Sequence, residues 1–419
     1  MTPSRTPEPA FRWVIVAAAA AMLAIAMGQL VNGLSAFLAP LEREFGATRG
    51  QVALVNTMGL VGLAIGGIVM GALADRVSIR AVVLAGAVMT GLCIATASQV
   101  TALWQLHLLF LVAGALGGGA LFAPLFALVG TWFRTGAGLA IGIVSAGQAI
   151  GQGGVPLANA LLIESLGWRG AFLAVGLASL ALLVPLALLA RRPGARPGPA
   201  AAAQPGQAAG GAAAMRPATV IATLSLAVLC CCSLMSVPLM HLAPLVQLCA
   251  IPAPEAAGVV MVMMLAAIAG RVAFGRLADM IGALPAYFAA SAWQTALVVM
   301  FTWIDDLGLF YIFSPIYGFG YAGVMTGVLT TIRALTPLNR RAGATGIILA
   351  FAWIGHGLGG FLGGVFFDLT GSYDLSFAAA MAAGLVNLIT IGALAWWVLR
   401  GPAGRATVNG SFAAGSGRI

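Results

Sequence analysis

Charged residues are scarce in this chain of 419 amino acids. They make up 7% of the sequence, whereas about 25% of a soluble domain is charged. Hydrophobic residues make up 61%, and the mean hydropathy is +1.04. Because so little charge cannot cover a surface that faces water, we expect lipid to be the solvent for most of the chain. The 56 glycines fit this expectation, since glycine lets membrane helices approach one another closely.

Lysine is absent, and all 20 basic residues are arginine. Without lysine the chain cannot form a G-x-x-x-x-G-K-[ST] phosphate-binding loop, which excludes ATP as a driving force of that kind. The 5 cysteines show no metal-ligand spacing and no disulfide framework. No Ser-His-Asp order or HExxH motif stands in a suitable context. We therefore expect a protein that is not an enzyme, with no cofactor, no metal site and no nucleic-acid partner.

Long apolar runs make up most of the chain. Hydropathy predicts twelve spanning helices, each of about 20 mostly apolar residues. They cover residues 13–38, 51–74, 80–98, 103–130, 137–162, 170–190, 217–241, 258–278, 283–303, 307–333, 343–366 and 375–398. The first run is longer than the apolar region of a secretory signal, so we predict that it spans the membrane and is not cleaved.

These runs fall into two groups of six. The predicted fold is an all-α integral membrane protein with one six-helix bundle at 13–190 and a second at 217–398. Residues 191–216 between the bundles are rich in proline, alanine and glycine and carry four arginines, a composition typical of a disordered linker. Short tails, 1–12 and 399–419, flank the bundles.

Arginine is distributed unevenly between the loops. If the N-terminus is cytoplasmic, sixteen of the 20 arginines fall on the cytoplasmic side, and the exceptions are Arg43, Arg49, Arg169 and Arg271. Positive residues concentrate on the cytoplasmic side of membrane proteins. The split therefore predicts a multi-pass protein of the plasma membrane, in a bacterium the inner membrane, with both termini in the cytoplasm. We expect the protein to be a monomer in the lipid bilayer.

The two halves repeat with one offset. A shift of 204 residues takes Gly71 to Gly275 and Asp75 to Asp279. It also joins glycines of other helices: Gly114 to Gly318, Gly119 to Gly323, Gly142 to Gly346, and Gly151 to Gly355. An even number of helices in each half predicts two parallel, pseudo-symmetric halves related by an axis along the membrane normal.

The loop after the second predicted helix, GALADRVSIR at 71–80, carries a recognisable motif. It resembles the loop signature of the major facilitator superfamily, although Ser78 stands where the family usually has glycine. A degenerate copy follows the eighth predicted helix. The resemblance implies the major facilitator fold, with the substrate bound between the halves. We expect these loops to act as a conformational latch formed by Gly71, Asp75, Arg76, Arg80, Gly275 and Asp279.

Four further stretches resemble the monocarboxylate and oxalate–formate porter branch of that superfamily. They are FLAPLEREFG at 37–46, WFR with GLAIG at 132–142, GWRGAF at 167–172, and HLAP at 241–244. The resemblance implies a secondary active transporter of a small organic anion such as a monocarboxylate. Transport would proceed by alternating access with proton symport or anion exchange.

Arg271 lies within a predicted span, about one helical turn before the second copy of the loop motif. No carboxylate lies three or four residues from it in the sequence, and arginine keeps its charge at any ordinary pH. It is therefore a candidate receptor for a substrate carboxylate, which a guanidinium binds through two parallel hydrogen bonds. Alternatively, its side chain reaches the cytoplasmic headgroups. An arginine of this helix binds the carboxylate in the resembled branch, but the acid that proton-coupled members carry one turn earlier is Ala267 here.

His356 lies between Gly355 and Gly357, which leave room for a ligand or for another helix. An imidazole titrates near neutral pH in water, so His356 is a candidate second cation, proton carrier or neutral donor. The oxalate–formate porters have a lysine on this helix. A histidine that only packs between helices is the alternative. The offset pairs His356 with Gln152, which is a further candidate for the substrate site.

Several other polar or aromatic residues fall within predicted spans. Tyr317 and Tyr321 share a helix face at a spacing of four, and with Trp353 they are candidates to line the substrate site. Gln29 and Asn32 form a polar stripe in the first predicted span. For the aromatic residues, packing or an interfacial position is the alternative.

Two other functions remain open from the sequence. One is a major facilitator exporter of drugs or neutral metabolites, which would not need Arg271. The other is a transporter-like sensor, although the tails are short for a signalling domain. All 11 acidic residues fall in tails, loops or helix ends, so protons could enter through His356 or with the substrate, or exchange could replace them.

Overall fold

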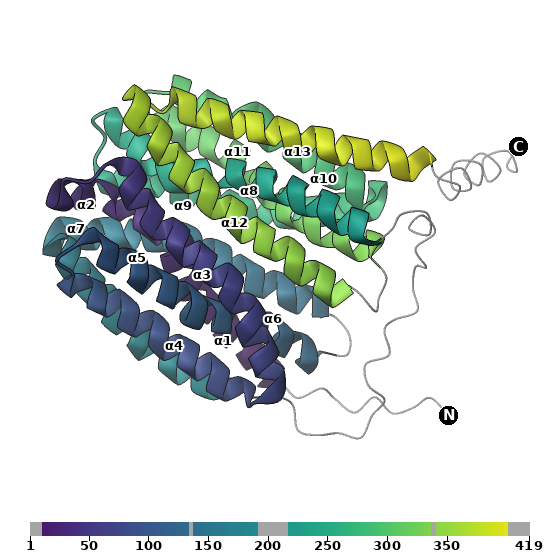
Figure 1. Cartoon of the computed structure of the whole chain (residues 1–419), viewed down its shortest axis with the longest axis horizontal. Helices are drawn as coiled ribbons and strands as arrows, with labels where there is room; N and C mark the ends of the chain where they lie inside the picture. Colours follow the sequence, from purple (N-terminus) through teal and green to yellow (C-terminus); the bar gives the residue numbers. More distant parts are fainter. Residues whose placement is uncertain (1–10, 134–136, 192–216, 337–340, 401–419) are drawn as a thin grey trace, which may run out of the picture. The chain divides into compact units, whose positions relative to one another are not determined.

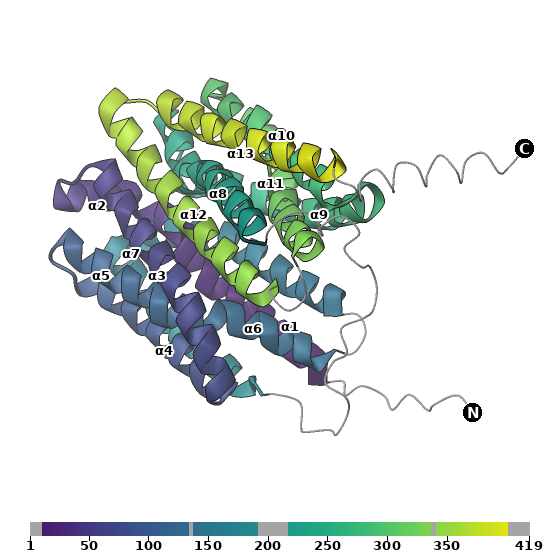
Figure 2. The same ribbon diagram turned by 45° about the vertical axis from the view of Figure 1, so that its right-hand side comes forward.

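The computed structural model describes residues 11–133, 137–191, 217–336 and 341–400, and every regular element in these ranges is helical. Figures 1 and 2 show the helices from two directions. Apart from Arg191, the predicted linker 191–216 lies outside the described residues, as do most of the two predicted tails.

The described residues of the first half form seven α-helices, and two pairs of them, α1 with α2 and α5 with α6, each belong to one membrane span. They are α1 (Phe11–Met27), α2 (Leu38–Phe45), α3 (Arg49–Arg76), α4 (Ile79–Thr96), α5 (Leu103–Val112), α6 (Gly119–Trp132) and α7 (Ala137–Leu189). A π-helical turn at Gly28–Asn32 and a 3-10 turn at Gly33–Phe37 join α1 to α2. A second π-helical turn, Ala113–Gly118, joins α5 to α6. In both figures α3, α4 and α5 run side by side.

The second half has six α-helices within residues 217–336 and 341–400, and each begins a new span. They are α8 (Pro217–Leu248), α9 (Ala253–Ile281), α10 (Ala283–Leu297), α11 (Leu307–Leu335), α12 (Arg341–Thr370) and α13 (Asp374–Arg400). A 3-10 turn at Val298–Trp303 extends α10. The start of α11 is capped by Asp306, whose Oδ2 accepts a hydrogen bond of 2.9 Å from the Leu309 N–H.

The described residues contain 11 helical runs that are long and apolar enough to cross a membrane. One of them, Ala140–Leu189, has 50 residues. At 1.5 Å per residue it would extend about 75 Å, more than twice the thickness of a bilayer core. Gly167 interrupts it with φ +70° and ψ 169°, a conformation that glycine adopts without a side-chain clash. The run therefore makes two crossings, which gives the predicted total of twelve.

The prediction of a loop at 163–169 was wrong in its extent. Helix α7 continues on both sides of Gly167, and the chain reverses at this glycine alone. Hydropathy marked a gap because Glu164, Ser165 and Arg169 are polar, yet polar residues at a membrane surface are compatible with helix.

Glycine contacts repeat between the halves with the same offset of 204. A side chain at Gly66 in α3 would collide with the carbonyl oxygen of Ala115, and one at Gly270 in α9 would collide with that of Phe319. Both members of each pair are related by the offset. Gly151 packs in the same way against Ala24, while Gly355 packs against Leu229, one residue from the offset position. These close approaches fix the same helix pairs in each half, as glycine does in membrane proteins.

The chain packs as two compact units, one formed by residues 1–201 with 239–265 and the other by residues 202–238 with 266–419. Helix α7 ends at Leu189 and α8 begins at Pro217, whereas the bundles were predicted at 13–190 and 217–398. The predicted division into two bundles at these bounds stays a prediction.

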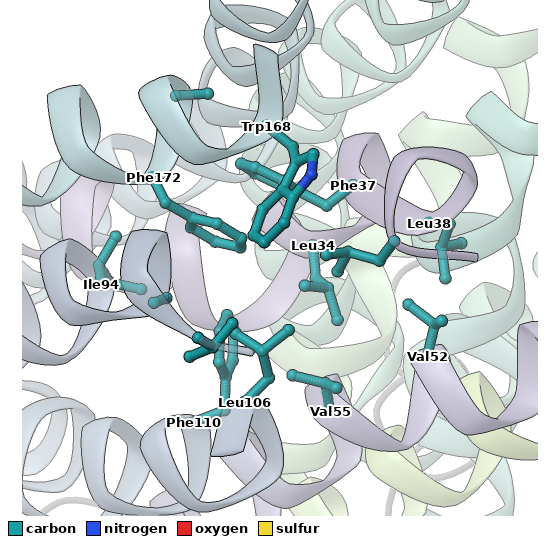
Figure 3. Packing of buried hydrophobic residues seen from close by; sticks show 14 of the residues in the cluster. Leu34, Phe37, Leu38, Val52, Val55, Ile94, Leu106, Phe110, Trp168 and Phe172 are labelled. Carbon is teal, nitrogen blue, oxygen red and sulfur yellow. The ribbon is translucent and has the colours of Figure 1, made fainter. Parts of the chain in front are cut away.

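An apolar cluster holds the turn of α7 in the first unit. Figure 3 shows Trp168 and Phe172 projecting from α7 toward Phe37 and Leu34. The rings of Phe37 and Phe172 stack with centroids 3.9 Å apart. Two of the stretches that resemble the porter branch therefore meet in this cluster.

Arg169 anchors the same turn by polar contacts. Its Nη1 donates to the carbonyl oxygens of Ser98 and Val100 at 3.0 and 2.9 Å, and its Nη2 donates to Glu44 at 3.1 Å. Its guanidinium also lies 4.2 Å from the centroid of the Trp168 ring. Arg169 thus connects the break in α7 to Glu44 at the end of the first span and to the turn that follows α4.

Candidate functional site

The first span loses regular helical geometry where Gln29 and Asn32 lie. Where a π-helical turn passes into a 3-10 turn, some carbonyl oxygens lose their helical donors, and π-helical turns are frequent at functional sites. The Asn56 side chain, from α3, donates to the carbonyl oxygens of Leu30 and Val31 at 2.9 and 3.1 Å. Asn56 is 1% exposed, so a buried amide replaces the missing donors.

A second break in a helical ladder faces this turn. Pro156 in α7 has no N–H, so the carbonyl oxygen of Gln152 lacks its usual donor one turn later. The Asn32 side chain supplies a hydrogen bond of 2.9 Å to that oxygen. The buried side chain of Asn32, a residue of the predicted site, therefore connects the irregular turn of the first span to the break in α7.

Asn159 adds a third contact between α7 and the first span. Its Nδ2 donates to the carbonyl oxygen of Gly33 at 3.0 Å and to Gln29 Oε1 at 3.4 Å. The structure thus brings Gln29, Asn32 and Gln152 together, along with Asn159, in one buried amide cluster of the first unit. The side-chain oxygens of Asn32, Gln152 and Asn159 have no hydrogen-bond partner within the described residues.

In the second unit Arg271 lies half-buried in α9. The close approach of Gly270 to Phe319 holds α9 against α11 one residue from the guanidinium. From α11 the phenol of Tyr321 lies within electrostatic range of Arg271. The arginine and the tyrosine that the sequence selected separately are therefore neighbours.

The remaining aromatic candidates of this unit are buried to different degrees. Tyr317 and Tyr321 are 0% and 3% exposed, and their ring centroids are 6.4 Å apart. The Tyr317 hydroxyl has no hydrogen-bond partner in the part of the chain that the structure describes. Trp353 is half-buried in α12, and the centroid of its ring lies 6.3 Å from that of the His356 ring.

His356 is buried in α12 with a free ring nitrogen. It is 5% exposed, and its Nε2 has no hydrogen-bond partner among the described residues. Gly355 beside it packs against the Leu229 backbone of α8, and Ser233 Oγ donates to the Gly355 carbonyl oxygen at 2.9 Å. This packing holds α12 against α8 and fixes the height of the imidazole in the unit.

Some buried polar residues were not selected from the sequence. Asn159 belongs to the amide cluster, and Asn56 bonds to the irregular turn beside it. In the second unit Tyr287 donates to Asn387 at 3.1 Å. Gln294 Nε2 lies 3.5 Å from Cys231 Sγ. An amide within an apolar span was the available signal, and the spacing of seven between Gln152 and Asn159 could have placed both on one face.

The latch residues lie at helix ends. Arg76, Arg80 and Asp279 are exposed, and Gly71 has no neighbouring atom within 4 Å of the position that a Cβ would take. The side chain of Asp75 lies outside the described part of the structure, so the latch remains a prediction.

The sequence matches known proteins over most of its length. The Major Facilitator Superfamily model matches residues 14–304 and 224–417. Monocarboxylate transporter 13 of Rattus norvegicus is 26% identical over 397 residues, which cover 92% of this chain and 90% of the relative. Monocarboxylate transporter 11 of Mus musculus is 33% identical over 195 residues, 44% of this chain and 43% of the relative. Like this one, several of the matches to monocarboxylate transporters span less than half of the relative's length.

Solved structures share the fold at low identity. A bacterial homologue of the human lysosomal transporter Spinster, in an inward-facing and unoccupied conformation, has a TM-score of 0.68 and 18% identity. That comparison covers 96% of this chain and 99% of the other. The nucleoside transporter NupG has a TM-score of 0.72 and 13% identity, with 91% and 99% covered. These similarities concern the fold alone.

Proposed function

The chain belongs to the major facilitator superfamily, and from that premise we propose that it is a secondary transporter of a small organic anion, a monocarboxylate. As a multi-pass membrane transporter it resembles the monocarboxylate branch. The substrate class goes beyond this resemblance and rests on the chemistry of the second unit.

Arg271 is the observation that carries the proposal. Placing a permanent cation within a membrane span costs free energy. Charged groups at this depth are therefore rare and commonly mark substrate pathways. A guanidinium binds a carboxylate through two parallel hydrogen bonds, and Tyr321 places a phenol donor within electrostatic range of it. Arg271 as a whole is half-buried in α9.

The other candidate residues have supporting roles in this proposal. Tyr317, Trp353 and His356 line the substrate path in the second unit. The amides Gln29, Asn32 and Gln152 supply neutral hydrogen-bonding groups from the first unit. Among the described residues, Asn32, Gln152, Tyr317 and His356 each have a buried polar atom without a hydrogen-bond partner, which a ligand would supply in this proposal.

Coupling and location complete the proposal. Proton symport or anion exchange drives the transport, with His356 or the substrate carrying the proton. The protein is a monomer in a plasma membrane, in bacteria the inner membrane, with both termini in the cytoplasm. The distribution of arginine supports this orientation.

A transporter of an uncharged solute is the second candidate, because the same fold serves a nucleoside transporter. In that case Arg271 would not bind the substrate. Transport by an Arg271→Ala variant would then remain near the wild-type rate.

The test is uptake by purified protein in proteoliposomes. Labelled lactate, pyruvate, formate and oxalate are supplied under a pH gradient or against an internal counter-substrate. We expect saturable uptake of at least one monocarboxylate, inhibited by the others. Absence of carboxylate transport under every gradient, from protein that is folded by circular dichroism, would exclude the proposed substrate class.

A further inference from the structure

Three helix ends of the first unit meet in a cluster of aromatic rings and arginines. The ring centroids of Phe11 in α1 and Trp132 in α6 lie 5.6 Å apart. The indole N–H of Trp132 donates to the carbonyl oxygen of Arg191, just after α7, at 2.9 Å. The rings of Trp13 and Phe133 make a second contact between α1 and the end of α6, with centroids 5.3 Å apart. The start of α1 and the ends of α6 and α7 therefore lie together at one end of the unit.

Both arginines of this cluster hold their guanidinium groups against aromatic rings. The guanidinium of Arg191 lies 4.2 Å from the centroid of the Phe11 ring. That of Arg12 lies 5.1 Å from the centroid of the Phe133 ring and 5.7 Å from that of the Trp13 ring. A guanidinium is planar and carries its N–H donors around its edge, so it can contact a ring with its face and still donate to an anion.

The cluster is positively charged. The stretches that form it, residues 11–16, 128–133 and 187–191, contain two arginines and no aspartate or glutamate. The other end of the first span differs, because the charge of Arg49 is balanced there by Glu42, whose Oε1 lies 2.6 Å from the arginine Nε. The charge of the cluster is not balanced within its own stretches, which favours an anion from outside the chain.

The surface beside the cluster is apolar. Trp13 and Val14 are 40% and 43% exposed at the start of α1, and Leu188 is 44% exposed near the end of α7. Tryptophan is enriched where a membrane meets water, at the level of the lipid headgroups. One turn deeper, the three helices leave an apolar gap of about 10 Å³, which has room for one water molecule and not for an acyl chain. An amphiphilic ligand would therefore place its apolar part on the outer surface.

We propose that Arg12 and Arg191 bind the phosphate of an anionic phospholipid, whose acyl chains lie along Trp13, Val14 and Leu188. Arginine donates two parallel hydrogen bonds to phosphate oxygens. Basic groups at the ends of membrane helices attract anionic lipids. The rings hold the guanidinium groups at the end of the span, where a headgroup can reach them. A bound lipid connects the ends of α1, α6 and α7, so it should stabilise the folded protein.

The test compares thermal unfolding of the purified full-length protein in detergent with rising phosphatidylglycerol or phosphatidylcholine. Both lipids have a phosphate and acyl chains, but only the first has a net negative charge. Glycerol phosphate supplies the headgroup without the chains. A double variant, Arg12→Gln with Arg191→Gln, removes both cations of the cluster. Arg43→Gln is the matched control, because Arg43 is an exposed arginine of α2, at the other end of the same span.

We expect phosphatidylglycerol to raise the unfolding temperature of the wild type saturably and more than phosphatidylcholine does, as a ligand of the folded state should. The double variant should weaken the apparent affinity for phosphatidylglycerol by about tenfold or more, because each basic group at a membrane surface adds to the attraction. Arg43→Gln should match the wild type. Equal stabilisation by the two lipids, or a wild-type response of the double variant, would show that the arginines only hold the helix ends together and would overturn the proposal.

Two further outcomes keep the proposal decidable. Stabilisation by glycerol phosphate at the same concentrations as phosphatidylglycerol would assign the cluster to free phosphate and overturn the lipid site. If the double variant does not fold, Arg191→Gln alone decides, since this side chain is exposed and its loss should weaken the phosphatidylglycerol affinity by about threefold or more. An unchanged affinity would overturn the site. None of these measurements involves transport, so the result is independent of the proposed substrate.

Discussion

The two halves keep the same scaffold and differ in their polar groups. Gly66 and Gly270 occupy equivalent places in the close packing of helices, and the offset of 204 also relates the residues that they contact. The polar positions diverge, because Gln152 corresponds to His356 and Gln29 to Ser233. Packing at a glycine tolerates no larger side chain, whereas a ligand-facing position can change with its ligand. The two halves therefore share this packing and differ in their polar residues.

The polar groups of the two units differ in kind. The first unit has neutral amides that bond to broken helical backbone, and the second has a permanent cation, phenols and an imidazole.

The largest effect is expected from substituting Arg271, a permanent cation of the second unit. Arg271→Lys keeps the positive charge but loses the planar fork that binds a carboxylate in two places. We expect carboxylate uptake in proteoliposomes to fall by about 100-fold or more, since charge-assisted pairs of this kind are among the strongest hydrogen bonds. Uptake by Arg271→Lys within a few-fold of the wild type would show that a point charge is sufficient.

The next prediction tests the shared scaffold. Gly66→Ala and Gly270→Ala should each lower the free energy of unfolding by about 1–3 kcal/mol, because each added methyl group meets a backbone carbonyl. The measurement is thermal unfolding of each variant in one detergent. Gly142→Ala and Gly346→Ala are the controls, since both positions face open space and should change stability by about 0.5 kcal/mol or less. If Gly66→Ala lowers stability and Gly270→Ala does not, the two glycines are not packed equivalently.

A smaller effect is expected from substituting His356, whose equivalent in the first half is Gln152. His356→Gln makes the second half resemble the first and removes the titratable ring. It should alter the pH dependence of uptake, measured from about pH 5.5 to 8, or the preference between mono- and dicarboxylates, because a protonated ring adds a second cation. An unchanged pH profile and substrate ranking would assign the proton to the substrate or favour exchange.

The smallest expected effect concerns the loops that both halves share. Asp75→Asn should slow the transport cycle and leave substrate affinity within about a few-fold, because a latch acts on the conformational equilibrium. Uptake rates and binding measured by thermal shift give the two quantities separately. A large loss of binding by a folded variant would place Asp75 in the substrate site instead.

Much of the fold could be predicted because lipid imposes simple rules. A spanning segment must satisfy its own backbone hydrogen bonds, so a long apolar run indicates a helix wherever it occurs. The run that crosses at 283–303 was predicted at the bounds the structure has for α10 and its 3-10 extension. A break between residues 162 and 170 was predicted, but its restriction to Gly167 was not, because hydropathy averages over a window and cannot locate a single residue with positive φ.

The candidate site could be predicted only in part. Arg271 and His356 stood out because charge or titration within a span is costly. Asn56 and Asn159 did not, because an amide in an apolar helix can serve packing as readily as function. Their importance depends on which carbonyl oxygens the neighbouring helices leave without donors.

The sequence alone determined the solvent, the twelve crossings and the repeat, since composition and periodicity depend on local residues. Only the tertiary structure decided that Asn32 reaches the oxygen exposed by Pro156 and that Asn159 faces Gly33. Those contacts join residues more than a hundred positions apart. No local pattern specifies them, because they depend on how two irregular helices pack and on the close approach that a glycine allows between them.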